Sequence, residues 1–361
     1  MPKEIIIKAP ARICLFGDHQ DYIGLPVIAC TINRFITLSA IENNSRTLNI
    51  NMPDINDRRI IDLNKPLKPI AERDYFISAL NVLRRYDCIP ITGFDIKITG
   101  NIPVNAGLSS SSAIVVSWIT FLLNAYGSSQ PITQELIAHL AYSSEVLEYN
   151  EPGGLMDQYT ISLGKTVFLD TVSGNYTRIN KNISSLIVGE SGVPKKTLSI
   201  LKKLRGYAQD SILSVQKDKP NFEIRNASIE DYETYEKYVP DDLKPIFYAA
   251  LKNYTITKDA FNEFKKETID MRAIGSLMTQ HHLVLKDILK ITVPIIDTMI
   301  DGAMNAGAFG AKIVGSGGGG CIVAIANHEN EEKVIKGILK GGAKLAYKIT
   351  ISDGTKVIKN A

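Results

Sequence analysis

The sequence predicts a mixed α+β protein made of two lobes. A chain of 361 residues is long for a single hydrophobic core, so two lobes are expected at this length. Segments that alternate like strands are interleaved with segments whose apolar residues have helical spacing. The composition, 45% hydrophobic and 22% charged, is that of an ordinary folded protein. We place the boundary near Asn180, which predicts an N-terminal lobe at residues 1–180 and a C-terminal lobe at residues 181–361.

Charge and cysteine usage favour a small-molecule partner and a reducing compartment. The formal net charge of +3 is small for this length and gives no electrostatic argument for a nucleic acid or a membrane surface. The longest apolar run is too short to span a bilayer, and the N-terminus has no signal-peptide pattern. We therefore expect a cytoplasmic protein. Its cysteines have no CxxC spacing, which predicts reduced, mostly buried thiols instead of a zinc site or disulfides: Cys14, Cys30, Cys88 and Cys321.

One stretch organises the N-terminal lobe. Residues 103–113 read P-V-N-A-G-L-S-S-S-S-A, follow strand-like alternation at residues 94–98, and precede an apolar run at residues 114–125. A strand, a turn and a helix that starts among the serines are predicted. The first-turn amides of such a helix have no intrahelical partner, so the stretch is a candidate phosphate site. Taken alone, it is equally compatible with a serine-capped core helix.

The N-terminal residues predict a polar cluster at the end of a strand. Residues 4–8 and 12–16 have the pattern of strands, separated by a turn at residues 9–11, and lead into G-D-H-Q-D-Y. Carboxylates accept hydrogen bonds from hydroxyls, and His and Tyr can either donate or accept, so the cluster suits a polyhydroxylated ligand. A solvated turn is the alternative, but it leaves Arg12 and His19 unexplained.

Two acidic residues stand out in the rest of this lobe. Strands are predicted at residues 27–29, 35–41 and 166–169, and helices at 75–86 and 133–149. The first helix could wall a nucleotide base or be scaffold. Glu145 lies late in the second helix, where an acid opposes the helix dipole; this suggests a cation partner, with a surface salt bridge as the alternative. Asp157 follows two glycines in apolar company and must be paired, hydrogen-bonded or functional.

The C-terminal half predicts a strand at residues 186–188, helices at 197–216, 257–285 and 294–306, and a glycine-rich hairpin. His281 and His282 are interpreted as helix-cap or surface residues because no third ligand is near in sequence. Strands at 311–314 and 321–326 flank a turn with five glycines. A hairpin needs fewer, so we expect bare backbone to face a phosphate or the serine-rich loop. A flexible hairpin is the alternative.

These features, in this order, resemble the GHMP kinases. The family's second motif runs as proline, three residues, Gly-Leu, Gly or Ser and then Ser-Ser, and residues 103–113 match it. Its first motif is matched by A-P-A-R-I-C-L-F-G-D-H-Q-D-Y and its third by V-G-S-G-G-G-G-C. H-Q-D-Y and G-G-L-M-D-Q are most similar to the galactokinase branch, because mevalonate kinases lack the Asp-Tyr and heptose kinases have a different run there.

The resemblance implies a two-lobed fold, with an N-terminal lobe like domain 2 of ribosomal protein S5 and a ferredoxin-like C-terminal lobe. It implies an ATP-dependent kinase that phosphorylates the anomeric hydroxyl of a monosaccharide, most simply galactose. Asp157 would act as base or orienting acceptor beside Arg12. Mg²⁺ would be held by Ser111 and Glu145. ATP is expected at Pro103, Asn105, Ala106, Gly107, Leu108, Ser109, Ser110, Ser111 and Ser112, and the sugar at Arg12, Asp18, His19, Asp21, Tyr22, Gly154, Asp157, Gly317 and Gly318.

Two departures leave the sugar open. Galactokinases carry Glu where this chain has Asp18, and they offer a Tyr near the point where S-G-V-P-K-K places Val193. Other acceptors therefore stay possible: fucose, a heptose, an N-acetylhexosamine, a pentose, or a mevalonate-type alcohol. A non-catalytic sensor of sugar and ATP is a further alternative. We expect a monomer or a weak homodimer.

Overall fold

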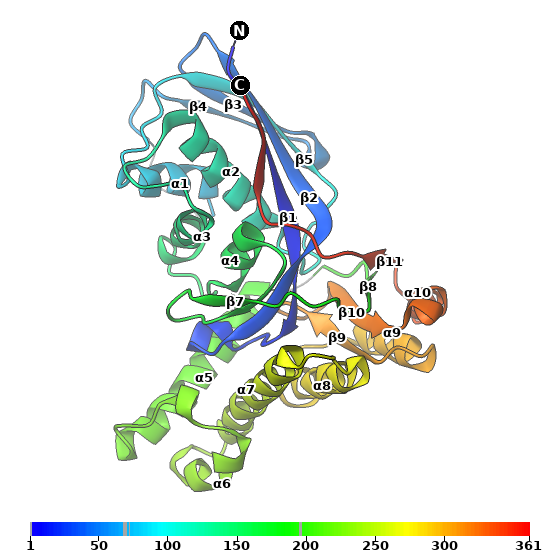
Figure 1. The fold of residues 1–361 in the computed structure, drawn as a ribbon. Coiled ribbons are helices and arrows are strands. Elements are labelled where there is room, and N and C mark those ends of the chain that lie inside the picture. The colour runs from blue at the N-terminus through cyan, green and yellow to red at the C-terminus, as the bar shows by residue number, and fades with distance from the viewer. Residues whose placement is uncertain (1, 68–70, 72, 195–196) are drawn as a thin grey trace.

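Two antiparallel-rich sheets with helices packed on them make up the protein (Figure 1). The computed structural model describes residues 2–67, 71, 73–194 and 197–361. The predicted mixed α+β class is confirmed. The first sheet has eight strands in the order β12-β1-β2-β5-β3-β4, with β6 paired to β2 and to β7; the second has four, in the order β11-β8-β10-β9.

The first sheet is built around two long strands. Predicted strands at 4–8 and 12–16 are one strand, and the predicted turn at 9–11 is wrong: a register shift between Pro10 and Ala11 lets the chain continue, as expected where Pro cannot donate to the ladder. Predicted strands at 27–29 and 35–41 likewise form one strand. The bounds are β1 (Glu4–Phe16), β2 (Val27–Asn43), β3 (Thr47–Met52), β4 (Asp57–Asp62), β5 (Gly93–Gly100), β6 (Thr166–Leu169), β7 (Tyr176–Arg178) and β12 (Lys356–Asn360).

Four helices cover one face of this sheet: α1 (Tyr75–Arg84), α2 (Ser110–Tyr126), α3 (Gln134–Tyr142) and α4 (Met156–Leu163) (Figure 1). Helix α2 packs its large aromatic side chains into the core, where Trp118 and Phe121 are at most 1% exposed. Thr133 caps α3 as predicted, its side chain accepting from the Leu136 amide. After α3 the chain widens into a π-helical turn, Ser143–Leu147.

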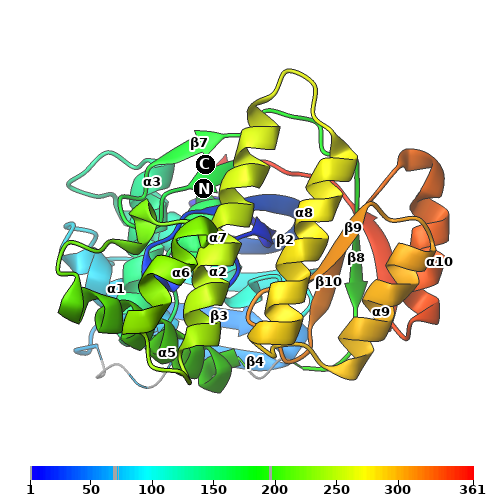
Figure 2. The same ribbon diagram turned by 90° about the horizontal axis from the view of Figure 1, so that it is seen from below.

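The helices α5 to α10 belong to the C-terminal half of the chain, together with the second sheet. Figure 2 shows α7 and α8 side by side, with α9 and α10 on the second sheet. The predicted helix at 257–285 is wrong in one respect: it is two helices, because the Asp270 side chain accepts from the Arg272 and Ala273 amides and starts a new one. The bounds are β8 (Ser185–Glu190), β9 (Gly310–Val314), β10 (Cys321–Ala326), β11 (Leu345–Ile349), α5 (Thr197–Asp218), α6 (Tyr232–Tyr235), α7 (Lys244–Lys265), α8 (Met271–Leu283), α9 (Pro294–Asn305) and α10 (Glu331–Lys340).

The end of the chain returns to the beginning. Strand β12 pairs antiparallel with β1, so residues 356–360 belong to the first sheet although they follow the second in sequence (Figure 1). The lobe boundary at residue 180 stays a prediction.

Buried and exposed polar residues are distributed partly as predicted. The surface histidines are a correction: His281 and His282 lie in the last turn of α8 but are only 0% and 4% exposed. All four cysteines are buried thiols, as predicted.

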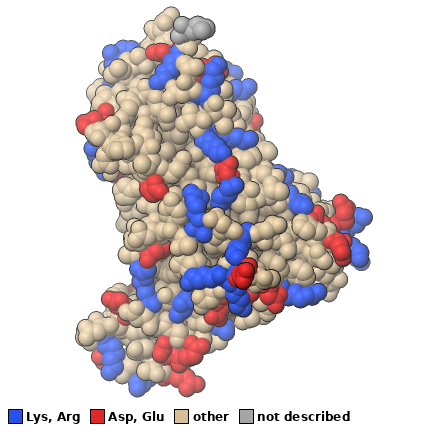
Figure 3. Space-filling model, in the orientation of Figure 1, with Lys and Arg blue, Asp and Glu red and all other residues tan. Residues whose placement is uncertain are grey.

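On the face shown in Figure 3, acidic and basic side chains lie among larger areas of uncharged surface. Within the described residues, every helix is too short or too polar to traverse a bilayer.

Candidate active site

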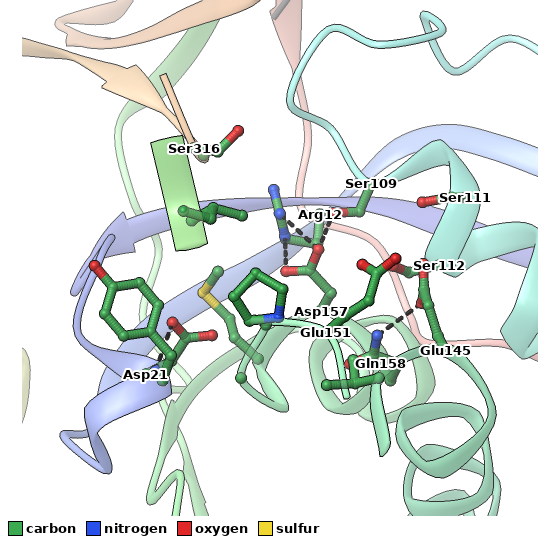
Figure 4. A pocket seen from close by; sticks show the side chains of 18 of the residues that line it. Arg12, Asp21, Ser109, Ser111, Ser112, Glu145, Glu151, Asp157, Gln158 and Ser316 are labelled. Carbon is green, nitrogen blue, oxygen red and sulfur yellow. Dashed lines mark hydrogen bonds and ion pairs between the residues drawn. The ribbon is translucent and has the colours of Figure 1, made fainter. Parts of the chain in front are cut away.

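A cavity of about 670 Å³ lies where the first sheet, the helices on it and the glycine turn of the second sheet meet. Residues far apart in sequence line it: strand β1 and the segment after it, the loop before α2 and the first turn of α2, the π-helical turn, the loop into α4 and its first turn, and the turn between β9 and β10 (Figure 4). The predicted catalytic, metal and sugar-binding residues are drawn from these same segments.

Arg12 and Asp157 form a bidentate ion pair in this cavity. Arg12 Nε donates to Asp157 Oδ1 at 2.7 Å and Arg12 Nη2 to Oδ2 at 2.8 Å. The remaining Arg12 nitrogen, Nη1, donates to the Gly107 carbonyl at 2.7 Å. Ser109 Oγ donates to Asp157 Oδ2 at 2.5 Å. Since the fork of an Arg fixes both position and angle, strand β1 and the first turn of α4 hold the carboxylate in one place.

The serine-rich loop leaves the start of α2 open to a ligand. Ser109 is the N-cap residue, but its φ of 58° is left-handed and its side chain does not cap the helix; its hydroxyl goes to Asp157 instead. Asn105 and Gly107 also have positive φ, and such turns form concave anion sites from backbone N–H groups. The serine-capped alternative is therefore wrong at Ser109. Of the predicted nucleotide residues, four line the cavity: Asn105, Ser109, Ser111 and Ser112.

The other predicted nucleotide residues do not line the cavity, and two of them bind Arg12 through their backbone carbonyls. Leu108 is fully buried, and its carbonyl accepts from the Arg12 amide at 3.3 Å. Gly107 accepts from the Arg12 side chain, as described above. Four loop residues, Pro103, Ala106, Gly107 and Leu108, do not line the cavity, and neither does Ser110, the first residue of α2.

Glu145 points into the cavity from the π-helical turn. Such turns are frequent at functional sites. Glu145 is only 6% exposed and accepts from Gln158 Nε2 at 2.7 Å. Burial, with a smaller contribution from the charge of Asp157, raises the pKa of Glu145 to about 7, although hydrogen bonds from Gln158 and the serines oppose the shift. Gln158 was missed by the sequence analysis, since nothing in its pattern pointed to Glu145.

The oxygen donors at this end fit a hard divalent cation. Glu145 contributes a carboxylate, and the hydroxyls of Ser111 and Ser112 lie against it. Within the described part of the chain, there is no group of three or more His, Cys, Asp or Glu that could hold a metal. A cation here would keep most of its ligands as water or phosphate oxygens, which is how Mg²⁺ is commonly bound.

The opposite end of the cavity carries the hydroxyl-binding candidates. Tyr22 Oη lies 3.1 Å from His19 Nδ1, and the Ser316 carbonyl lies 3.2 Å from His19 Nε2. Because a carbonyl only accepts, the His19 proton is on Nε2 in this contact, and Nδ1 accepts from Tyr22. Burial and the nearby charge of Asp157 raise the pKa of Asp21 to about 7. Gly154 faces Asp21 so closely that a Cβ would overlap the carboxylate.

The glycine turn packs on the serine-rich loop, which confirms one of the two interpretations of its bare backbone. A Cβ on Gly320 would lie 2.7 Å from the Ala106 carbonyl, and one on Gly315 would lie 3.3 Å from the Gly107 carbonyl. Gly315 and Ser316 line the cavity. The predicted sugar residues Gly317 and Gly318 instead face Ile291: the Gly318 amide donates to the Ile291 carbonyl at 2.7 Å.

Three family models match the chain in order. The "Galactokinase galactose-binding signature" matches residues 2–40, the "GHMP kinases N terminal domain" matches residues 74–165, and the "GHMP kinases C terminal" model matches residues 259–344. The chain belongs to the GHMP kinase family. GHMP kinases are ATP-dependent kinases, and this chain is therefore a kinase.

Galactokinases and mevalonate kinases are both similar to this GHMP kinase. A galactokinase of Clostridium perfringens is 28% identical over 344 residues, covering 91% of this chain and 87% of the relative. A mevalonate kinase of Methanocaldococcus jannaschii is 27% identical over 351 residues, covering 94% and 98%. Among solved structures, Lactococcus lactis galactokinase complexed with galactose has a TM-score of 0.87 at 22% identity, covering 98% of this chain and 95% of that chain. The predicted two-lobed GHMP kinase fold is confirmed.

Proposed function

We propose that this GHMP kinase transfers the γ-phosphoryl group of ATP to the anomeric hydroxyl of a monosaccharide, most simply galactose. The observation that carries the proposal is the Arg12–Asp157 pair, held between the serine-rich loop and the His19–Tyr22 cluster in one cavity. The match of the galactose-binding signature to residues 2–40 supports a sugar acceptor.

The nucleotide end uses main-chain amides. The triphosphate would lie at the start of α2, where uncapped N–H groups and the helix dipole favour negative charge. Glu145 and Ser111 would hold Mg²⁺ there together with phosphate oxygens, and that ion would supply neutralisation of the phosphate charge. The γ-phosphoryl group would then lie toward Asp157 in the same cavity.

Asp157 and Arg12 act on the acceptor hydroxyl. The anomeric oxygen forms a bond to the γ-phosphorus while the bond from that phosphorus to the β,γ-bridging oxygen breaks, and ADP leaves. Asp157 accepts the hydrogen bond of the attacking hydroxyl, and Arg12 fixes its orientation. Since the transition state is loose and needs little base strength, a carboxylate already paired with Arg12 mainly orients the hydroxyl. It takes up the proton only as the bond to phosphorus forms and then passes it to solvent.

The remaining hydroxyls of the sugar would meet His19, Asp21 and Tyr22 beside Gly154. We expect Asp21 to accept from hydroxyls of the acceptor, since the Tyr22 amide donates to only one of its oxygens, at 3.0 Å. For the whole protein we propose a cytoplasmic monomer or weak homodimer, with its lobes divided near residue 180.

A mevalonate-type alcohol kinase is the second candidate, because mevalonate kinases match the chain over as much of its length as galactokinases do. The presence of Asp21 and Tyr22 disfavours it. A non-catalytic sensor is disfavoured because Asp157, Arg12 and the serine-rich loop are all in place.

A coupled ADP-release assay tests the proposal. The purified protein is supplied with ATP and each member of a panel of monosaccharides, with R-mevalonate as the competing acceptor and with or without Mg²⁺. We expect ADP release that depends on galactose and Mg²⁺ and that the Asp157→Asn variant lacks. ADP release with mevalonate but with none of the monosaccharides would establish the second candidate. If none of the acceptors supports ADP release, the sugar-kinase proposal is overturned.

A further inference from the structure

Lys312 is a charged residue at the centre of the molecule that the mechanism above does not use. It lies on β9 and is 0% exposed. Its Nζ donates to the Cys14 carbonyl at 2.9 Å and to Asp18 Oδ2 at 2.5 Å. The other oxygen of that carboxylate, Asp18 Oδ1, accepts from the Gly315 amide at 2.8 Å. Both oxygens of Asp18 are therefore engaged, one by β9 and the other by the glycine turn that follows it.

A histidine next to the ion pair carries no charge. His281 of α8 stacks on Phe16 with ring centroids 6.3 Å apart, next to the pair. Burial and the positive charge of Lys312 lower the pKa of His281 to about 3, so its ring stays neutral. Although burial opposes the charged carboxylate, Lys312 lowers the pKa of Asp18. Lys312 and Asp18 thus face each other as a buried cation and anion, and Arg12 and Asp21 lie near enough to interact electrostatically with Asp18.

Stability alone does not account for such a pair. Removing two charges from water costs as much as their attraction returns, and apolar residues of similar volume often serve a core equally well or better. A buried ion pair does, however, admit few alternative arrangements of the segments that carry it. The use of a buried pair to fix position is documented in some systems.

The segments joined here are the two that meet at the acceptor end of the cavity. Asp18 belongs to residues 17–22, which also carry His19 and Asp21. Lys312 lies on β9 three positions before the glycine turn at residues 315–320. The contact from His19 Nε2 to the Ser316 carbonyl spans the same junction.

We propose that Lys312 is a positioning residue: through Asp18 it ties the acceptor loop, residues 17–22, to the glycine turn and sets where His19 and Asp21 face the sugar. Asp18 is then the counter-ion of Lys312 and does not contact the acceptor. This inference rests on the proposed function. It explains why the chain tolerates Asp where galactokinases carry Glu, because the shorter carboxylate reaches Lys312 and the Gly315 amide.

Paired substitutions test the inference. Asp18→Asn and Lys312→Met each leave one buried charge without its partner, so each single variant should unfold at lower urea concentration than the parent. The double variant removes both charges and should be more stable than either single variant. In the double variant we expect the KM for the sugar to rise by about tenfold, or about 1.4 kcal/mol, while the KM for ATP stays within about twofold. Lys348→Met, which removes the cation of the Glu331 ion pair outside the cavity, is the control and should leave both KM values unchanged.

Hydrogen exchange gives a readout that needs neither substrate. In the double variant, amides of residues 17–24 and 315–320 should exchange faster, while those of the buried helix α2 should not. An unchanged sugar KM with unchanged exchange at these segments would overturn the inference, as would a double variant no more stable than the weaker single variant. If the parent protein phosphorylates no sugar, the proposed function fails, and exchange and stability alone then decide whether Lys312 ties the loop.

Discussion

Replacing Asp157 with Asn tests the centre of the proposed mechanism with a small change of shape. The amide keeps one acceptor oxygen for Arg12 Nε and can donate to Ser109 Oγ, but it cannot also accept from Arg12 Nη2, which now donates at 2.8 Å. The Arg12 side chain is only 4% exposed, so water replaces the lost acceptor poorly.

The size of the effect follows from these contacts. Stranding one member of a buried ion pair costs about 3–5 kcal/mol. Here the Asp157 side chain is 26% exposed, and Arg12 keeps its bonds to the amide oxygen and to Gly107, so we expect about 2 kcal/mol of lost stability. Turnover should fall by about two to four orders of magnitude, which is about 3–5 kcal/mol in the activation free energy, because the attacking hydroxyl loses its charged acceptor.

Three measurements separate these effects. Urea unfolding reports stability, calorimetry reports ATP binding, and ADP release at saturating sugar reports turnover. We expect ATP binding to be retained, since the phosphates lie at the start of α2. Ser109→Ala is the control: it removes one donor from the same carboxylate but keeps the charge, and should cost no more than about tenfold in turnover. Turnover of Asp157→Asn within tenfold of the parent would refute the assigned role.

Further predictions concern Asp21 and Glu145, the two carboxyls whose pKa is raised, and Ser111 beside Glu145. Ser111→Ala and Glu145→Gln should each increase the Mg²⁺ concentration needed for half-maximal activity; an unchanged requirement would remove that residue as a ligand. Asp21→Ala should weaken sugar binding by about tenfold or more and leave ATP binding unaltered, as calorimetry with each ligand can show. Because burial raises the pKa of Asp21 to about 7, the folded protein holds that proton between about pH 4 and pH 7 while the unfolded chain has released it. Stability from this group therefore falls as the pH rises through that window. Asp21→Asn should flatten that slope in urea titrations, and an unaltered slope would contradict the assignment. The sugar KM should decrease from pH 6 to pH 8 in the parent but not in Asp21→Asn.

Local sequence patterns predicted most helices and strands. They failed where a single contact decides whether an element continues or ends. The strand at 166–169 and the helix at 75–86 were predicted closely, because a short apolar run and helical spacing of apolar residues are each typical of the element that forms. The turn at 9–11 was predicted from Pro10, yet a bulge absorbs this residue within β1. The break between α7 and α8 depends on Asp270, whose capping bonds outweigh a helical pattern that continues on both sides.

Site residues could be predicted where their neighbours in sequence mark them as unusual, but their partners in space could not. Asp157 stood out because an acid beyond two glycines in apolar company needs a partner, but its partner Arg12 is 145 positions away, and only the family resemblance linked the two. Lys312 and Gln158 were missed. A lysine within an apolar strand is ordinarily interpreted as facing solvent, and only the tertiary fold places Asp18 against it.

The carboxylates that line the cavity differ in whether a cation faces them. Three of its carboxylates are matched by a cation: Asp18 by Lys312, Asp157 by Arg12, and Glu151 by Arg73 at 3.4 Å. Among the described residues, no ion pair is formed by the other two lining carboxylates, Asp21 and Glu145, and these are the two whose pKa rises to about 7. Glu145 lies beside the serines where the triphosphate is expected, and Asp21 lies beside His19 where the sugar is expected. A divalent cation beside Glu145 and sugar hydroxyls beside Asp21 would each stabilise the ionised carboxylate. Binding of ATP with its cation and of the sugar would therefore supply the interactions that these two carboxylates lack in the protein alone.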